Sequence, residues 1–133
     1  MTTFLALLPI SFLLLWPQFI FGGVREGKAV YETSELGMKL TEKALVNIEV
    51  KTVRVGERSQ LNCAREALVF YQDQIGVYRL REGWFKLVQV TVIKKNNLEA
   101  IIRSGELRST DDLVVHGADL LRVSEMDAFE SEQ

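Results

Sequence analysis

The pattern of hydrophobic and polar positions predicts a short helix early in the charged part of the chain. In residues 40–48, Ala44, Leu45 and Ile48 lie on one side of a helix, and Thr41 stands where an N-cap is expected. An acidic residue follows in the first turn, where it interacts favourably with the helix dipole. The spacing therefore predicts a helix over 40–48.

After this helix the hydrophobic period changes to that of β-strands separated by short turns. The segment 84–95 is rich in β-branched residues and is predicted to be one strand, which ends at the turn signal Asn96-Asn97. Gly56 and Gly83 are expected to end strands, and 118–123 to add a helical turn. The other predicted strands are 50–55, 67–71, 75–82, 98–102 and 113–117. This even spacing predicts a mainly β fold, a small antiparallel β-barrel or β-roll with one or two short helices.

The first 23 residues differ from the rest because they carry no charge. All 16 basic and 18 acidic residues lie at or after Arg25, and the stretch 4–21 is apolar except at Pro9, Ser11, Pro17 and Gln18. Such a hydrophobic helix is a targeting or membrane element. Two alternatives stay open: a signal peptide that is cleaved after Gly22, and a retained anchor, since about 18 residues approach the minimum for a bilayer span. Both predict a periplasmic domain, exported or anchored to the inner membrane.

The charged region has no internal repeat and is predicted to form one domain. We divide the chain into a signal peptide or anchor (1–23), a connector (24–39), a β-domain (40–126) and an acidic tail (127–133). With 133 residues, 47% of them hydrophobic, the chain can bury a core. Its net charge of -2 and the lack of a basic patch argue against nucleic-acid binding.

Candidate chemistry is sparse. Asp111 and Asp112 could suggest an acid–base pair, but adjacent carboxylates in a turn are expected to face water or cap backbone amides. His116 is expected to be solvent-facing or hydrogen-bonded, and the single Cys63 cannot form an internal disulfide. No Ser/His/Asp arrangement, Gly-rich phosphate loop or Cys pair occurs, so we expect neither an enzyme nor a cofactor.

Two further sets of residues have alternative interpretations. Soft ligands suit Cu(I), but Met38, Cys63, His116 and Met126 have no ligand spacing, and we therefore predict no metal site. Trp84 and Phe85, which follow Gly83, are either core or edge packing, or an exposed aromatic pair that serves as a docking surface.

The stretch SGELRSTDDLVVHGADLL (104–121) resembles the C-terminal signature of periplasmic adaptor proteins, or membrane fusion proteins, of tripartite efflux pumps (the HlyD-like family). Arg65–Val92 and Leu40–Val55 are similar to two other segments of that family, in the same order. Thr110 replaces a turn glycine of the family pattern, and Glu106 is an extra residue. The signature positions matched are Ser104, Gly105, Leu107, Asp111, Val114, Val115, Gly117, Ala118, Leu120 and Leu121.

This resemblance implies the membrane-proximal domain of an adaptor, which docks on an inner-membrane transporter. Only about a dozen residues separate Val55 from Ala67, where a complete adaptor carries its lipoyl, hairpin and barrel domains. The resemblance therefore predicts a stand-alone, non-enzymatic, membrane-associated protein-binding domain, or the remnant of a longer adaptor. Its partners are a transporter or other adaptor subunits, with homo-oligomers as in the family. A small extracytoplasmic metal or ligand carrier is the alternative.

Overall fold

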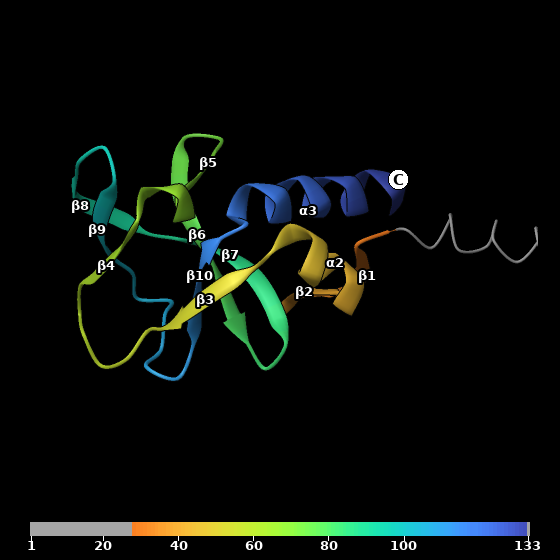
Figure 1. The fold of residues 1–133 in the computed structure, drawn as a ribbon, viewed down its shortest axis with the longest axis horizontal. Helices are drawn as coiled ribbons and strands as arrows, with labels where there is room; N and C mark the ends of the chain where they lie inside the picture. Colours follow the sequence, from red (N-terminus) through yellow and green to blue (C-terminus); the bar gives the residue numbers. More distant parts are fainter. Residues whose placement is uncertain (1–27, 133) are drawn as a thin grey trace, which may run out of the picture.

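The computed structural model describes residues 28–132, with side chains up to residue 130 (Figure 1). The predicted mainly β fold with antiparallel sheets and two helices is confirmed. Its strands are β1 (Val30–Ser34), β2 (Gly37–Leu40), β3 (Lys51–Arg54), β4 (Leu61–Ala64), β5 (Val69–Tyr71), β6 (Gln74–Arg81), β7 (Trp84–Gln89), β8 (Thr91–Lys95), β9 (Glu99–Arg103) and β10 (Asp112–His116). Its helices are α2 (Glu42–Ile48), the 3-10 turn η1 (Arg65–Ala67) and α3 (Ala118–Glu132).

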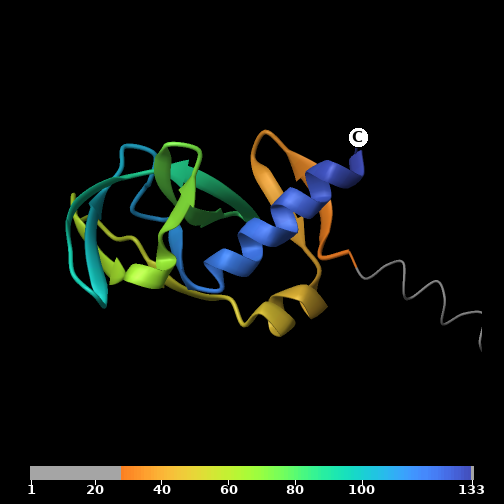
Figure 2. The same cartoon turned by 90° about the horizontal axis from the view of Figure 1, so that it is seen from above.

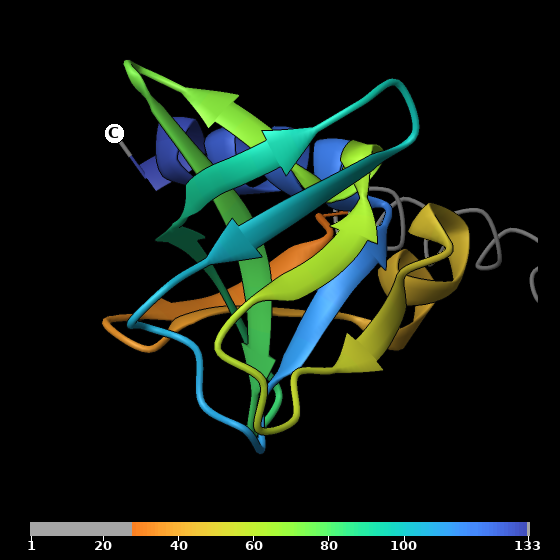
Figure 3. The same ribbon diagram turned by 90° about the vertical axis from the view of Figure 1, so that its left-hand side faces the viewer.

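The strands form two sheets, and the described residues form no closed barrel. The larger sheet has the order β1-β2-β7-β6-β10-β3, and β5 also pairs with β6. The smaller sheet has the order β4-β9-β8 and lies in front of β6 in the view of Figure 3. Between the sheets lies one hydrophobic cluster, to which Val77, Val88 and Leu113 contribute from the larger sheet and Cys63 and Ile102 from the smaller one.

A second hydrophobic cluster lies on the opposite face of the larger sheet, under the helices. Tyr78 and Val114 point into it and contact the layer that contains Leu121 and Ala128 of α3. Because side chains alternate across a strand, neighbouring residues of β6 and β10 fill different clusters. Figure 2 shows α3 crossing this face, with its C-terminal end beside the β1–β2 hairpin.

The helix predicted over 40–48 is confirmed as α2. Thr41 is its N-cap, and the hydroxyl oxygen of Thr41 accepts a hydrogen bond from the Ala44 N–H at 3.1 Å. The reversal predicted at Gly83 is also confirmed, since Glu82 and Gly83 both have positive φ in the two-residue turn from β6 to β7.

The prediction of one strand over 84–95 is wrong. β7 pairs with β6 in the larger sheet, whereas β8 pairs with β9 in the smaller sheet. The change of sheet occurs at Val90, whose N–H donates to the carbonyl of Ile75 at 2.9 Å. Because both halves are extended and apolar, the residue pattern does not show where the chain leaves one sheet for the other.

The structure differs from the expected segments at four further places. The expected connector 24–39 contains β1 and most of β2, and the expected acidic tail from 127 continues α3 as far as Glu132. β4 was not predicted, and Ala67 belongs to η1 rather than to a strand. The hydrophobic helix expected in residues 1–23 lies outside the described residues. Within the described range, no helix has both the length and the apolar character that crossing a membrane requires.

Candidate functional site

The centre of the signature segment is a buried carboxylate, that of Asp111. Its side chain is 0% exposed and accepts hydrogen bonds from Arg81 Nε at 2.6 Å and Arg81 Nη2 at 2.7 Å. The Arg108 N–H also donates to it, at 2.7 Å. The Arg81 guanidinium lowers the pKa of Asp111. Of the two alternatives expected for this carboxylate, facing water or capping a backbone amide, the structure shows the cap, at the Arg108 N–H.

Two arginines of β6 hold the loop between β9 and β10 in place. Arg79 Nη1 and Arg81 Nη2 both donate to the carbonyl oxygen of Glu106, at 3.3 and 3.4 Å. Arg79 is 7% exposed, and its burial lowers the pKa of the guanidinium. Because residues 79 and 81 share one face of the strand, both reach the same loop. The next aspartate, Asp112, instead forms a largely exposed ion pair with Arg54, at 3.1 Å.

The other signature residues shape the chain around this junction. Gly117 has a φ of 92°, and a Cβ there would lie 2.9 Å from Cγ2 of Ile48. Ala118 begins α3 and is buried, and Leu107 packs against the cluster between the sheets. Gly105 lies in open space, with nothing within 4 Å of the position that a Cβ would occupy. Apart from Gly105, these signature residues thus occupy positions that pack or connect the fold.

The thiol, imidazole and thioethers weighed as metal ligands lie in different parts of the fold. Cys63 is buried between the sheets, where burial raises the pKa of its thiol, whereas Met38 is buried in the cluster on the other face of the larger sheet. His116 Nδ1 is 2.9 Å from the carbonyl oxygen of Glu49, and Met126 is half exposed on α3. Residues 28–132 contain no group of three or more His, Cys, Asp or Glu side chains that could hold a metal ion.

The aromatic pair at the start of β7 is divided between core and surface. Phe85 is 3% exposed and belongs to the cluster under the helices. Trp84 is partly buried, and Lys39 Nζ lies 4.6 Å from the centroid of its ring, within the range of a cation–π contact. Phe85 and Lys39 also line a shallow hollow of about 320 Å³ together with the exposed Tyr31. The structure thus places this pair beside a surface depression and does not make both rings accessible.

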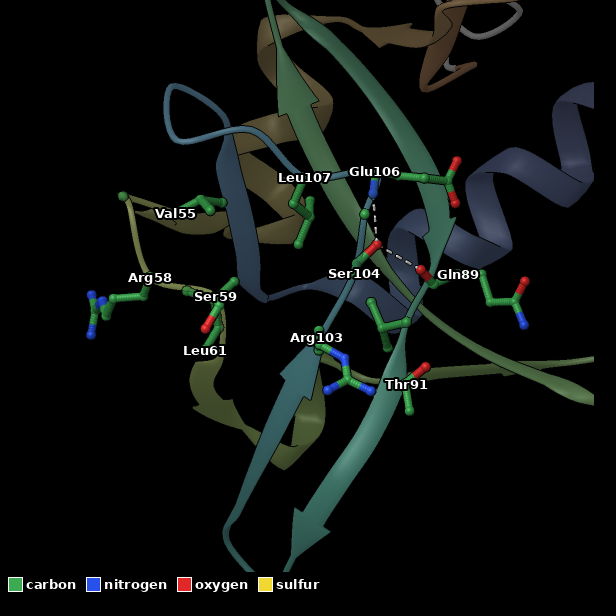
Figure 4. A pocket seen from close by; sticks show the side chains of 13 residues that line it. Val55, Arg58, Ser59, Leu61, Gln89, Thr91, Arg103, Ser104, Glu106 and Leu107 are labelled. Carbon is green, nitrogen blue, oxygen red and sulfur yellow. Dashed lines mark hydrogen bonds between the residues drawn. The ribbon is translucent and has the colours of Figure 1, made fainter.

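A larger open groove of about 610 Å³ lies where the two sheets meet (Figure 4). Its walls are the β3–β4 loop, the β7–β8 junction and the chain after β9. Arg103 points toward Thr91, while Arg58 points away from the other lining side chains. The Ser104 hydroxyl donates to the Gln89 carbonyl at 2.9 Å and accepts from the Glu106 N–H at 3.1 Å. Ser104 is thus engaged by the backbone, and Arg58, Arg103 and Glu106 give the groove a lining of mixed charge in which the charged groups do not converge.

The most exposed apolar surface that belongs to one element is on α3. Leu120, Val123, Met126 and Phe129 are 46%, 61%, 49% and 47% exposed. Sequence analysis missed this surface because it predicted only a helical turn over 118–123. The signal that could have revealed it is the recurrence of an apolar residue at every third position from 120 to 129.

Comparison with known proteins finds no matching family model, no matching curated protein and no matching solved structure.

Proposed function

We propose that this chain is a protein-binding domain that works at a membrane without catalysing a reaction. It docks on an inner-membrane transporter or on adaptor subunits, as the resemblance of segment 104–121 to the efflux-adaptor signature suggests. The observation that carries the proposal is the amount of exposed apolar surface. Eleven large hydrophobic side chains are exposed on the described residues, and four of them follow one another along α3. Exposed apolar side chains that gather on one element, as these four do on α3, are typical of protein-interaction sites, whereas singly scattered ones are not.

The roles of the signature residues support the same proposal. The only acidic signature residue, Asp111, has its carboxylate engaged by three donors and is closed off from solvent. Gly117 and Ala118 make the close contact between β10, α2 and α3. Signature residues that pack and connect the fold favour a function carried by the surface of the domain rather than by a reactive group.

The N-terminal segment supports a position close to a membrane. Eight residues, 22–29, separate the end of the apolar stretch from β1. Fully extended, they span at most about 28 Å. With the apolar segment retained as an anchor, the folded domain would therefore lie within that distance of the bilayer. β1 also contacts α3, so this helix lies beside the first strand after the apolar segment.

The test identifies an inner-membrane transporter encoded next to the gene of this chain, expresses it together with the full chain, and purifies both in a mild nonionic detergent. Size-exclusion chromatography with light scattering should give a stable complex whose mass equals the transporter plus a whole number of copies of this chain. A matched run with an unrelated membrane transporter should give no complex. A chain that stays monomeric beside its neighbouring transporter, and beside any adaptor subunit encoded there, would refute the proposal.

A further inference from the structure

The inner face of α3 is fixed to the larger sheet by both apolar and polar contacts. Leu121 and Ala128 are buried, at 0% and 8% exposed. Tyr78, buried on β6, donates its hydroxyl proton to Glu125 Oε1 at 2.6 Å. The helix is therefore held at several points along its length, and its outer face has a defined orientation.

The outer face of α3 combines apolar and acidic side chains. At 100° per residue, Val123 lies opposite the buried stripe, and Leu120 and Met126 lie on either side of it. Three carboxylates are exposed on the same half of the helix, those of Asp119, Asp127 and Glu130. We call this set of six side chains the outer face; Phe129 lies about 120° around the helix from Val123, on the side of Arg122, and does not belong to it.

The only basic residue of α3 is turned away from this face. Arg122 Nη1 lies 3.3 Å from Glu125 Oε1, and its guanidinium lies 5.7 Å from the centroid of the Tyr71 ring. Both contacts point it toward the sheet, where it is partly buried. The outer face consequently has three negative charges and no positive one, between apolar side chains that are about half exposed.

We infer that the outer face of α3 docks into a groove on a protein partner that is lined by both apolar and lysine or arginine side chains. This inference rests on the proposed function and adds the surface and the chemistry of the partner to it. A single helix can bind in this way when apolar residues three and four positions apart enter a groove. Asp119 and Asp127 lie one turn on either side of Val123, so basic side chains within the groove would pair with these carboxylates and fix the direction of the helix.

A bilayer surface is a poor occupant for this face. Helices that lie on membranes carry Lys and Arg on the polar side, because anionic lipids attract them. The outer face has the opposite charge and would be repelled by such lipids. A second copy of the chain is also a poorer match, because the two arginines of its own groove do not converge: Arg58 points away from the other lining side chains and Arg103 points toward Thr91.

The test uses a fluorescent 18-residue amphipathic peptide of Leu and Lys, and a matched peptide of Leu and Glu. The full chain is placed in phosphatidylcholine nanodiscs, empty nanodiscs give the baseline, and binding is followed by fluorescence anisotropy. We expect the Leu-Lys peptide to bind at least tenfold more tightly than the Leu-Glu peptide, with an affinity that falls as salt is raised. Equal binding of the two peptides would overturn the inference.

Two outer-face variants and one control test whether the peptide binds through the outer face of α3. Val123→Asp should weaken Leu-Lys binding at least tenfold because it puts a charge in the apolar centre, and Asp127→Asn with Glu130→Gln should flatten the salt dependence. Leu98→Asp, at a 78% exposed position in the β8–β9 turn, should leave binding unchanged. All of these side chains are exposed, so circular dichroism should show an unaltered fold. Binding that is insensitive to Val123→Asp would contradict the inference.

If the outer face instead bound a second copy of the chain or a membrane, the measurements would give different results. Concentration-dependent dimers in sedimentation runs that Val123→Asp abolishes, or preferential binding of the wild-type chain over Val123→Asp to anionic vesicles, would each overturn the inference. A transporter complex that forms equally well with Val123→Asp would refute this inference alone. A wild-type chain that binds the Leu-Lys peptide through α3 but no transporter would refute the proposed function alone.

Discussion

Substitution of Asp111 by asparagine should destabilise the protein more than any change to its neighbouring aspartate. The carboxylate is fully buried and forms two hydrogen bonds of 2.6 and 2.7 Å with Arg81 and one of 2.7 Å with the Arg108 N–H. Asparagine keeps the shape of the side chain but removes the charge and replaces one acceptor by a donor that faces the Arg81 guanidinium or the Arg108 N–H.

The expected cost follows from breaking a buried ion pair on one side only. Such a change leaves an uncompensated charge and costs about 3–5 kcal/mol. The Arg81 side chain is 23% exposed and can recover some hydration, which places the expected loss near the lower end, at about 3 kcal/mol. Arg79, which is buried on the same strand face, adds like charge and opposes further recovery. A loss of this size is a large part of the stability of a small domain.

The assay is urea unfolding of the full chain in a mild nonionic detergent, followed by circular dichroism and Trp fluorescence. Asp112→Asn is the matched control, since the Asp112–Arg54 pair is largely exposed and should contribute at most about 1 kcal/mol. Equal losses for the two variants would refute the assignment of Asp111 as the structural carboxylate.

The lowered pKa of Asp111 also predicts how the stability of the protein depends on pH. The pKa of Asp111 is lowered in the folded protein, so its contribution is present above the ordinary pKa of an aspartate and is lost as the pH falls through the lowered value. The difference in stability between the wild-type chain and Asp111→Asn should therefore be constant at neutral pH and shrink only in strong acid. A difference that is already shrinking at pH 6 would contradict the lowered pKa.

Three other measurements test the packing around the signature. Gly117→Ala should cost about 1–3 kcal/mol, because its φ of 92° and a contact of 2.9 Å with α2 leave no room for a Cβ, whereas Gly105→Ala, in open space, should be nearly neutral in the same urea titration. Tyr78→Phe should cost about 1.5–3 kcal/mol, since the lost hydrogen bond goes to the carboxylate of Glu125, and an unchanged midpoint would refute that bond. Cys63 should react with a thiol reagent only at the rate of unfolding, because its thiol is buried and its pKa raised; rapid labelling of the native chain would disprove this.

The sequence predicts most elements of this fold because local signals and tertiary structure agree there. Thr41 caps α2 as expected, and the alternation in 75–82 corresponds to β6, which is paired on both sides. Local sequence signals fail where the pairing of a strand depends on residues far along the chain. The run from Trp84 to Lys95 satisfies β-propensity throughout, yet only its partners β6 and β9 decide that Val90 divides it between two sheets.

The residues of the candidate surfaces were harder to predict from the sequence, because their environment also depends on tertiary contacts. Asp111 and Asp112 are adjacent and chemically identical, but Asp111 is buried against Arg81, thirty residues earlier, whereas Asp112 forms an ion pair with the exposed Arg54. Nothing in the local sequence separates them. The outer face of α3 was missed because its acidic residues resemble a solvated tail, and its apolar residues become a surface only when the helix is known to reach Glu132.

The two-sided character of α3 links the fold to the proposed docking. α3 carries apolar residues on both of its sides, and on the outer side they alternate with exposed carboxylates. The sheet covers one side, through Leu121 and through the Tyr78–Glu125 hydrogen bond. Tyr78 stands next to Arg79 on β6, and Arg79 holds the loop that contains the signature, so the helix and the signature loop are fastened to the same strand. A partner that covers the outer face would therefore bind a helix that is already held in place. Little of the binding free energy would be lost in ordering it.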